Sequence, residues 1–243
     1  MSDNGVLVVD DWETPASSYQ EEQVGSHCIG KHTYEVGRYR YYGTDGYKYF
    51  DVSNPLILTT LKELRDGRWE EWMTDSPTDY RAMQIYAQHA SGHVLTSGLG
   101  LGLIVPELCK SRVVDSITIV ESSPSVMALV GKYLPRDNRI KLLWGDFWKF
   151  IFLDDSRWDT IIVDLWVARG TKRHLEIYHK EVLPASEQLK AKYPGAQIVF
   201  HGFAGMPTES QITEAIFAGS IDEVLWGLKG YDNLCVPVPS LSA

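Results

Sequence analysis

The chain has no cysteine pair, no long apolar run and no excess of basic residues. Its three cysteines, Cys28, Cys109 and Cys235, lie far apart and form no C-x-x-C motif. This spacing disfavours a zinc site or a disulfide framework and favours reduced thiols. No stretch approaches the ~20 apolar residues of a membrane span, and the acidic N-terminus lacks the pattern of a signal peptide. We therefore expect a soluble, cytoplasmic protein with no membrane partner and no bound metal.

The charge balance is acidic. The 243 residues include 23 Lys and Arg against 32 Asp and Glu, which gives a formal net charge of −9. Proteins that bind nucleic acid through charge need clustered Lys and Arg, so nucleic acid is disfavoured and cationic or neutral partners are favoured. Hydrophobic residues make up 44% of the chain, which is enough for a large core and excludes a disordered or fibrous protein.

The first third of the chain is expected to be β-rich. Residues 1–25 show little periodicity and predict a loose lead-in. Residues 33–52 alternate Tyr and Val around a G-T-D-G turn, which predicts a β-hairpin. The stretch 54–67 opens with Asn-Pro and ends in glycine, which favours a short helix, and residues 68–74 favour a strand. We assign residues 1–75 to a small N-terminal extension.

Residues 76–243 are expected to form a Rossmann-like domain. A helix is predicted from Ser76 to about Gly92, and strands then alternate with helices. Strands are predicted in seven places, of which the last two would form a closing hairpin: 93–98, 116–122, 139–146, 158–166, 196–202, 223–228 and 233–239. This order predicts an α/β fold with a doubly wound, mostly parallel seven-stranded sheet and an antiparallel C-terminal edge.

A glycine-rich loop follows the first strand of this sheet. It contains Gly98, Leu99, Gly100 and Gly102, at the carboxyl end where open parallel sheets bind ligands. Glycines let the backbone turn sharply and approach a ligand. A dinucleotide fingerprint would need its third glycine at the position of Leu103, so the spacing favours a nucleoside without a pyrophosphate. A plain strand-to-helix turn is the alternative for this loop taken alone.

An acidic residue follows each of the next three strands. Glu121 lies where a carboxylate can accept the two hydroxyls of a ribose. Asp146 can accept from the amine of adenine while Phe147 or Trp148 packs on the ring. Asp164 ends the fourth strand. Each acid alone could be a solvated or helix-capping residue, but their order at successive strand ends predicts one nucleoside site.

The segments HVLTSGLGLGL, TIVESSPSVMALV, IKLLWGDFWKF and DTIIVDLW resemble the successive motifs of class I S-adenosylmethionine-dependent methyltransferases. The resemblance covers about residues 92–202. It implies the fold and the cofactor, S-adenosyl-L-methionine, but not the acceptor. By this resemblance the cofactor would contact Gly98, Leu99, Gly100, Gly102, Glu121, Ser122, Asp146, Phe147 and Asp164.

The N-terminal layout also resembles the spermidine synthase group, in which a β-rich segment and a helix precede the glycine loop. Two departures disfavour aminopropyl transfer to a diamine. The aspartate of that family's glycine loop is replaced by Leu101, and its acid-rich motif after the fourth strand is replaced by the run that begins at Asp164.

Candidates for the acceptor site lie at the end of the fourth strand and just after it, and one, Tyr80, lies before the glycine loop. Asp164 is our candidate catalytic base, although a role limited to capping or to ordering the cofactor is an equal alternative. Tyr80, Trp166 and Arg169 are candidate substrate contacts, with core packing or a solvated helix start as the alternative interpretation. His201 ends the fifth strand, where a lone histidine is more often structural than catalytic.

The function predicted from these features is methyl transfer to a small-molecule or protein acceptor. A spermidine synthase-like aminopropyltransferase is one alternative, and a non-catalytic binding module that retains the fold is another. A nicotinamide dehydrogenase is disfavoured by Leu103. A homodimer is left open.

Overall fold

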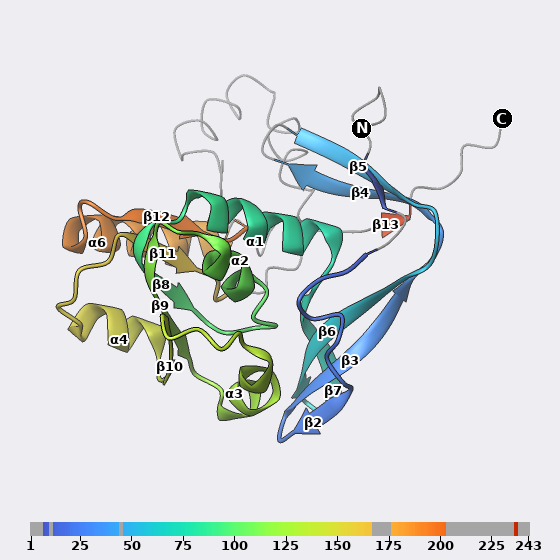
Figure 1. Cartoon of the computed structure of the whole chain (residues 1–243), viewed down its shortest axis with the longest axis horizontal. Helices are drawn as coiled ribbons and strands as arrows, with labels where there is room; N and C mark the ends of the chain where they lie inside the picture. The colour runs from blue at the N-terminus through green and yellow to red at the C-terminus, as the bar shows by residue number, and fades with distance from the viewer. Residues whose placement is uncertain (1–6, 10–11, 44–45, 167–175, 203–235, 238–243) are drawn as a thin grey trace.

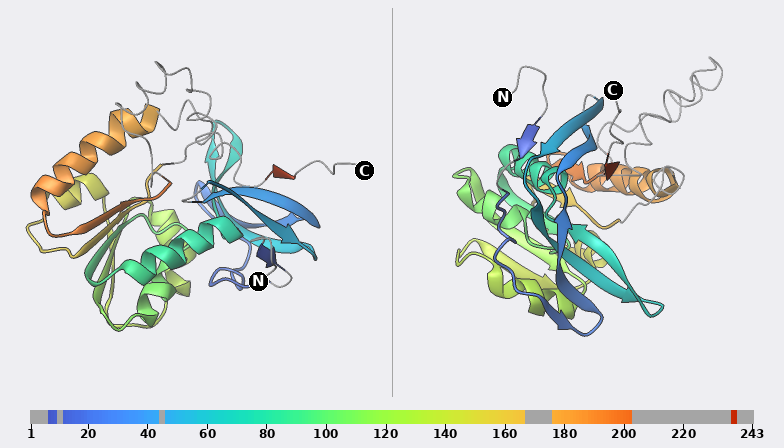
Figure 2. Two further views of the ribbon diagram at one scale, coloured as in Figure 1. Left: turned by 90° about the horizontal axis from the view of Figure 1, so that it is seen from above. Right: turned by 90° about the vertical axis from the view of Figure 1, so that its right-hand side faces the viewer.

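The computed structural model describes residues 7–9, 12–43, 46–166, 176–202 and 236–237. They form a five-stranded parallel sheet with helices on both faces, and two four-stranded sheets built mostly from the N-terminal part of the chain (Figure 1). The left view in Figure 2 places the parallel sheet and its helices on one side of the molecule and the N-terminal strands on the other.

The parallel sheet has the strand order β10-β9-β8-β11-β12. Its strands are β8 (Gly92–Ser97), β9 (Val114–Glu121), β10 (Ile140–Trp144), β11 (Thr160–Val163) and β12 (Gln197–Phe200). The chain runs outward from β8 to β10 and then restarts on the other side of β8 with β11. This is a doubly wound, Rossmann-like topology, and its switch point lies between the carboxyl ends of β8 and β11.

Alternating apolar residues on these strands face two separate cores. Val94 and Ile162 belong to one core and Leu95 and Ile161 to the other, as the two-residue period of a strand requires. The first core is covered by α1 (Pro77–His89), α2 (Ile104–Lys110) and α3 (Pro124–Val130), and the second by α4 (Phe147–Leu153) and α6 (Leu183–Lys192). Short 3₁₀ and π segments, η1 (Gly131–Tyr133) and η2 (Tyr178–Val182), extend α3 and precede α6.

Of the helices on the sheet, α1, α3 and α4 begin with side-chain caps that the sequence signals. The hydroxyl of Ser76 accepts the Asp79 N–H at 3.3 Å, and the carboxylate of Asp146 accepts the Lys149 N–H at 2.8 Å. Ser123 caps α3 in the same way. Proline follows Ser76 and Ser123 at the first helical position, where its missing N–H costs nothing.

The N-terminal strands form two sheets. One has the antiparallel order β2-β3-β6-β7, with β2 (Glu22–Val24), β3 (His27–Tyr34), β6 (Leu56–Arg65) and β7 (Arg68–Thr74). The other has the order β1-β5-β4-β13, with β1 (Leu7–Val9), β5 (Gly46–Val52), β4 (Gly37–Gly43) and β13 (Val236–Pro237). The predicted hairpin at 33–52 is present as β4 and β5, whose ends pair at Gly43 and Gly46.

The helix predicted at 54–67 is wrong, because β6 is a strand there. The segment contains β-branched Ile57, Thr59 and Thr60, which suit a pleated surface. Asp66 and Gly67 have φ of +48° and +75° and form the tight turn into β7. An Asp-Gly pair with both residues at positive φ is typical of a two-residue hairpin. Gly67 therefore belongs to a hairpin turn and does not end a helix.

The end of the sheet also differs from expectation. Five parallel strands are described in place of a seven-stranded sheet, and β13 pairs antiparallel with β4 of the N-terminal sheet. The strand predicted at 223–228 lies outside the described residues. The Rossmann-like class is confirmed, whereas the described C-terminal strand adds to the N-terminal sheet.

Residues 12–25, the continuous described part of the lead-in, are more ordered than their composition predicts. The Thr14 hydroxyl and the Thr59 N–H donate to the two oxygens of fully buried Asp75, at 2.5 and 2.6 Å, and the Trp12 indole donates to its carbonyl. The Tyr19 hydroxyl donates to the Leu101 carbonyl at 3.0 Å. These bonds fix the end of β7 and the glycine loop relative to each other.

Candidate active site

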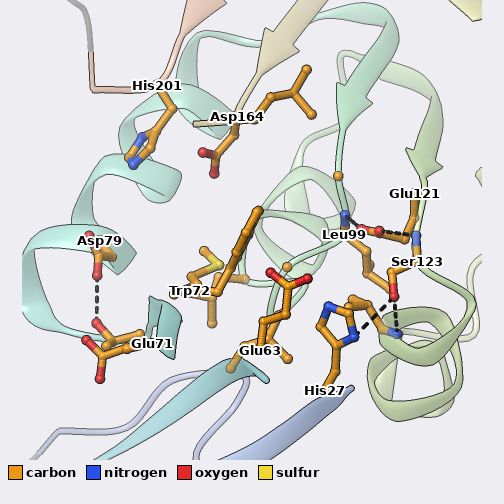
Figure 3. A pocket seen from close by; sticks show the side chains of 18 of the residues that line it. His27, Glu63, Glu71, Trp72, Asp79, Leu99, Glu121, Ser123, Asp164 and His201 are labelled. Carbon is orange, nitrogen blue, oxygen red and sulfur yellow. Dashed lines mark hydrogen bonds between the residues drawn. The ribbon is translucent and has the colours of Figure 1, made fainter. Parts of the chain in front are cut away.

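A cleft of about 900 Å³ lies where the N-terminal sheet faces the carboxyl ends of β8, β9, β11 and β12 (Figure 3). Its size is within the ~300–1,000 Å³ range of small-molecule sites. One wall is formed by the glycine loop and the residues after the parallel strands, and the other by β7 and the start of α1. The cleft therefore occupies the switch-point position at which doubly wound sheets bind ligands.

The glycine loop contributes two of its three glycines to the cleft. Gly98, Gly100 and Gly102 all have positive φ, between +51° and +70°. Gly98 and Gly100 line the cleft, and a Cβ on Gly100 would come within 2.6 Å of the Met73 sulfur. A Cβ on Gly102 would instead meet the side chains of Val130 and Leu134 at 3.3 Å. Gly102 thus permits core packing and does not line the cleft.

Glu121 braces the loop from the end of β9. Its side chain is only 6% exposed, yet it lines the cleft. One carboxylate oxygen accepts the Leu99 N–H and the other accepts the Ser123 N–H, both at 2.7 Å. Each oxygen keeps a further lone pair, so the carboxylate is fixed in place and can still accept two hydroxyls. Ser122 lies beside it on the cleft wall.

Asp164 stands at the switch point after β11. Its N–H donates to the Ser97 hydroxyl at 2.7 Å, and this bond fixes the Asp164 backbone beside the carboxyl end of β8. Its side chain lines the cleft, and within the described chain its carboxylate has no hydrogen-bond partner. Trp166 also lines the cleft and donates from its indole to Glu181 at 2.6 Å.

Two further polar residues lie at this end of the cleft. His201 follows β12, and its Nδ1 is 3.3 Å from the Tyr86 hydroxyl. Asp79 belongs to the first turn of α1 and accepts the hydroxyls of Thr74 and Ser76 at 2.7 and 2.9 Å. Burial raises the pKa of Asp79, and its hydrogen bonds and the proximity of His201 oppose that shift.

Several predicted site residues lie elsewhere. Asp146 is exposed and caps α4, and Phe147 is buried in the second core, so neither lines the cleft. Tyr80 does not reach the cleft either, because its hydroxyl donates to Glu107 of α2 at 2.5 Å. Burial and, to a lesser extent, that contact raise the pKa of Tyr80 to about 12. Arg169 lies outside the described residues.

The opposite wall of the cleft was not predicted from the sequence. Its residues come from the N-terminal sheet and from the start of α1 and include Met73. Figure 3 shows several others: His27, Glu63, Glu71, Trp72 and Asp79. The incorrect helix prediction at 54–67 concealed this wall, because β6 is the strand that joins β3 and β7 into one sheet. The Asp-Gly turn was the signal that could have revealed this wall.

Two negative findings apply to the described part of the chain. There, no three or more His, Cys, Asp or Glu side chains are grouped so as to hold a metal ion. None of the helices in those ranges combines the length and apolarity needed to cross a bilayer.

No protein-family model matches the chain. In sequence it is 32% identical over 120 residues to polyamine aminopropyltransferases of Buchnera aphidicola subsp. Acyrthosiphon pisum (strains Tuc7, 5A and APS). The predicted resemblance to this group of transferases is confirmed. The match covers 46% of the chain and 39% of each relative, so the chain matches about two fifths of the length of these relatives.

Solved structures similar to the chain include members of both predicted groups. A spermidine synthase in complex with the transition state analogue AdoDATO is 18% identical, with a TM-score of 0.38, over 60% of this chain and 46% of that one. An S-adenosylmethionine-dependent methyltransferase from Thiobacillus denitrificans in complex with S-adenosyl-L-homocysteine is 16% identical, with a TM-score of 0.38, over 61% and 58%.

Proposed function

We propose that the cleft binds S-adenosyl-L-methionine and that the protein transfers its methyl group to a small-molecule or protein acceptor. The observation that carries this proposal is Glu121, a carboxylate braced by the Leu99 and Ser123 N–H groups beside a loop of positive-φ glycines. A fixed carboxylate next to closely approachable backbone suits a ribose and its attached chain.

The residues present fit this cofactor. Glu121 would accept the ribose hydroxyls, with Ser122 on the adjoining wall, and the amino-acid chain would lie along the glycine-loop backbone at Gly98, which lines the cleft beside Glu121. Asp146 and Phe147 do not line the cleft, so we assign them no contact with adenine. When bound, the sulfonium supplies an activated carbon, and the protein has to align the acceptor with it.

Asp164 is the proposed base in this scheme. Its carboxylate lies in the cleft without a hydrogen-bond partner in the described chain. A nitrogen or oxygen nucleophile that gains a methyl group must lose a proton, and a nearby carboxylate can accept it. The Ser97 hydroxyl fixes the backbone of Asp164, which keeps this carboxylate at the switch point.

Aminopropyl transfer is the second candidate. It is favoured by the sequence similarity to polyamine aminopropyltransferases and by the acidic lining contributed by Glu63, Glu70 and Glu71, which would attract a cationic acceptor. Against it stand Leu101 in the glycine loop and the single acid at Asp164.

A pair of titrations would separate these proposals. Intact S-adenosyl-L-methionine and its decarboxylated form should be titrated separately by calorimetry. Tighter binding of the intact form supports methyl transfer, and tighter binding of the decarboxylated form supports aminopropyl transfer. Binding without any transfer of label to small-molecule or protein acceptors would favour a non-catalytic module. Absence of binding by both forms would contradict both enzymatic proposals.

Three further proposals concern the whole molecule. We propose that residues 1–75 form an extension and residues 76–243 the nucleoside-binding domain, because β7 ends at Thr74 and α1 begins at Pro77. A cytoplasmic location also remains a proposal. A homodimer is the third proposal, and sedimentation of the full chain tests it directly.

A further inference from the structure

The cleft has two chemically different ends. Glu121, Ser123 and His27 lie together at one end, and Asp79, Asp164 and His201 lie around the other (Figure 3). The three residues of the second end come from three different elements: α1, the end of β11 and the end of β12. Their convergence on one opening results from the fold and cannot be read from local sequence.

Asp79 is placed differently from an ordinary helix-capping acid. An acid three residues after a serine cap usually accepts the N–H of that serine. Here the Ser76 N–H donates to the Thr74 hydroxyl at 3.2 Å instead. The hydroxyls of Thr74 and Ser76 both donate to the Oδ2 atom of Asp79. The carboxylate is thereby released from the cap and held in a fixed orientation.

The remaining oxygen of Asp79 is available to a ligand. Among the described residues, no group donates to its Oδ1, and Asp79 is half-buried on the cleft wall. The Asp164 carboxylate and the Nε2 atom of His201 likewise have no partner in the described chain. Carboxylate oxygens and an imidazole nitrogen can form hydrogen bonds to a ligand when no protein group occupies them, so these three groups can together receive a polar ligand.

The charges at this end favour a cation. The groups that face Asp79 are Asp164, which raises its pKa, and His201, which lowers it, together with the hydroxyls of Thr74 and Ser76. Two carboxylates near one another repel unless a positive charge lies between them. In a transfer from a sulfonium, positive charge moves from sulfur to the acceptor atom. With the acceptor at this end of the cleft, that charge would develop beside Asp79 and Asp164.

We propose that Asp79 is a second catalytic carboxylate, which with Asp164 stabilises the positive charge on the nucleophile as the alkyl group arrives. This rests on the proposed function. The nucleophile's lone pair forms the new bond to carbon as the carbon–sulfur bond breaks. The electron pair of the broken bond stays on sulfur, which becomes a neutral thioether. The nitrogen or oxygen nucleophile then carries the positive charge and releases a proton to a carboxylate.

The test compares two cofactor analogues and therefore needs no acceptor. S-adenosylhomocysteine is a neutral thioether, whereas sinefungin carries an ammonium group in the position of the transferred methyl. Asp79→Asn keeps an oxygen for the Thr74 and Ser76 hydroxyls but removes the charge. We expect it to lower sinefungin affinity about 10- to 50-fold and to leave S-adenosylhomocysteine affinity within about twofold, both measured by calorimetry.

Two control variants complete the experiment. Asp115→Asn makes the same charge change at an exposed position at the start of β9, so the affinities for both analogues should stay unchanged. Asp79→Glu keeps the charge and should retain a preference for sinefungin. Equal affinities of the wild type and Asp79→Asn for sinefungin would overturn the role of Asp79, as would an equal loss for both analogues. Failure of the wild type to bind either analogue would instead contradict the proposed function.

Discussion

Replacement of Glu121 by glutamine tests the nucleoside end of the cleft most specifically. The two carboxylate oxygens accept the Leu99 and Ser123 N–H groups at 2.7 Å. An amide of the same size can accept only one of them and presents an N–H₂ group to the other. Loss of one charge-assisted hydrogen bond to a buried donor should lower the free energy of unfolding by about 1.5–3 kcal/mol, measured by urea denaturation.

Ligand binding should fall as well. If both ribose hydroxyls donate to Glu121, glutamine can accept only one, and the affinity for S-adenosylhomocysteine should fall about 10- to 100-fold. The 2′-deoxy form of the same ligand lacks one of these donors. Wild type should bind this form more weakly than the parent ligand, and Glu121→Gln should discriminate much less between the two in calorimetry.

A structural carboxylate outside the cleft provides the control. Glu107 accepts the Tyr80 hydroxyl at 2.5 Å and does not line the cleft. Glu107→Gln should therefore lower the free energy of unfolding without changing ligand affinity. If Glu121→Gln behaves in the same way, with lower stability and wild-type affinity, Glu121 only braces the loop and the assignment of the ribose site is refuted.

The other predictions concern the glycine loop, the proposed base and pH. Gly100→Val should abolish S-adenosylhomocysteine binding in calorimetry, because its Cβ would lie 2.6 Å from the Met73 sulfur on the opposite wall of the cleft. The control, Gly67→Val, lies at a positive-φ turn with open space around it and should leave binding intact. Normal binding by Gly100→Val would place the ligand elsewhere. Asp164→Asn should lower turnover more than cofactor affinity, and equal losses would indicate a binding role only. Burial raises the pKa of Asp75, so its contribution to stability is present below its unfolded pKa and is lost as pH rises through the folded pKa. The stability of wild type relative to Asp75→Asn should therefore fall in urea unfolding as the pH rises above the ordinary carboxyl pKa of about 4, and a gap that widens with pH would contradict the shift.

The parallel sheet could be predicted because local signals and tertiary structure agree there. Ser76 and Ser123 cap their helices as the sequence indicates, and the acids Glu121 and Asp164 follow buried strands. The carboxyl ends of parallel strands meet at one edge of a sheet, so the sequence order alone brings Gly98, Glu121 and Asp164 together.

The opposite wall could not be predicted in the same way. The stretch at 54–67 carries both a helix-start signal and β-branched residues, and pairing with β3 and β7 decides in favour of a strand. Position at a strand end also did not show which way a side chain points. Asp146 turns back to cap α4, and Phe147 enters the second core. Asp79 has the sequence pattern of a helix cap, and only the structure shows that its carboxylate accepts the Thr74 and Ser76 hydroxyls and lines the cleft.

A structure of the full chain with S-adenosylhomocysteine tests the central claim most directly. The account predicts the ligand in the cleft between the glycine loop and β7, with its ribose hydroxyls on Glu121 and its sulfur toward Asp164 and Asp79. A ligand bound elsewhere, or a cleft that stays closed to it at saturating concentration, would contradict the account.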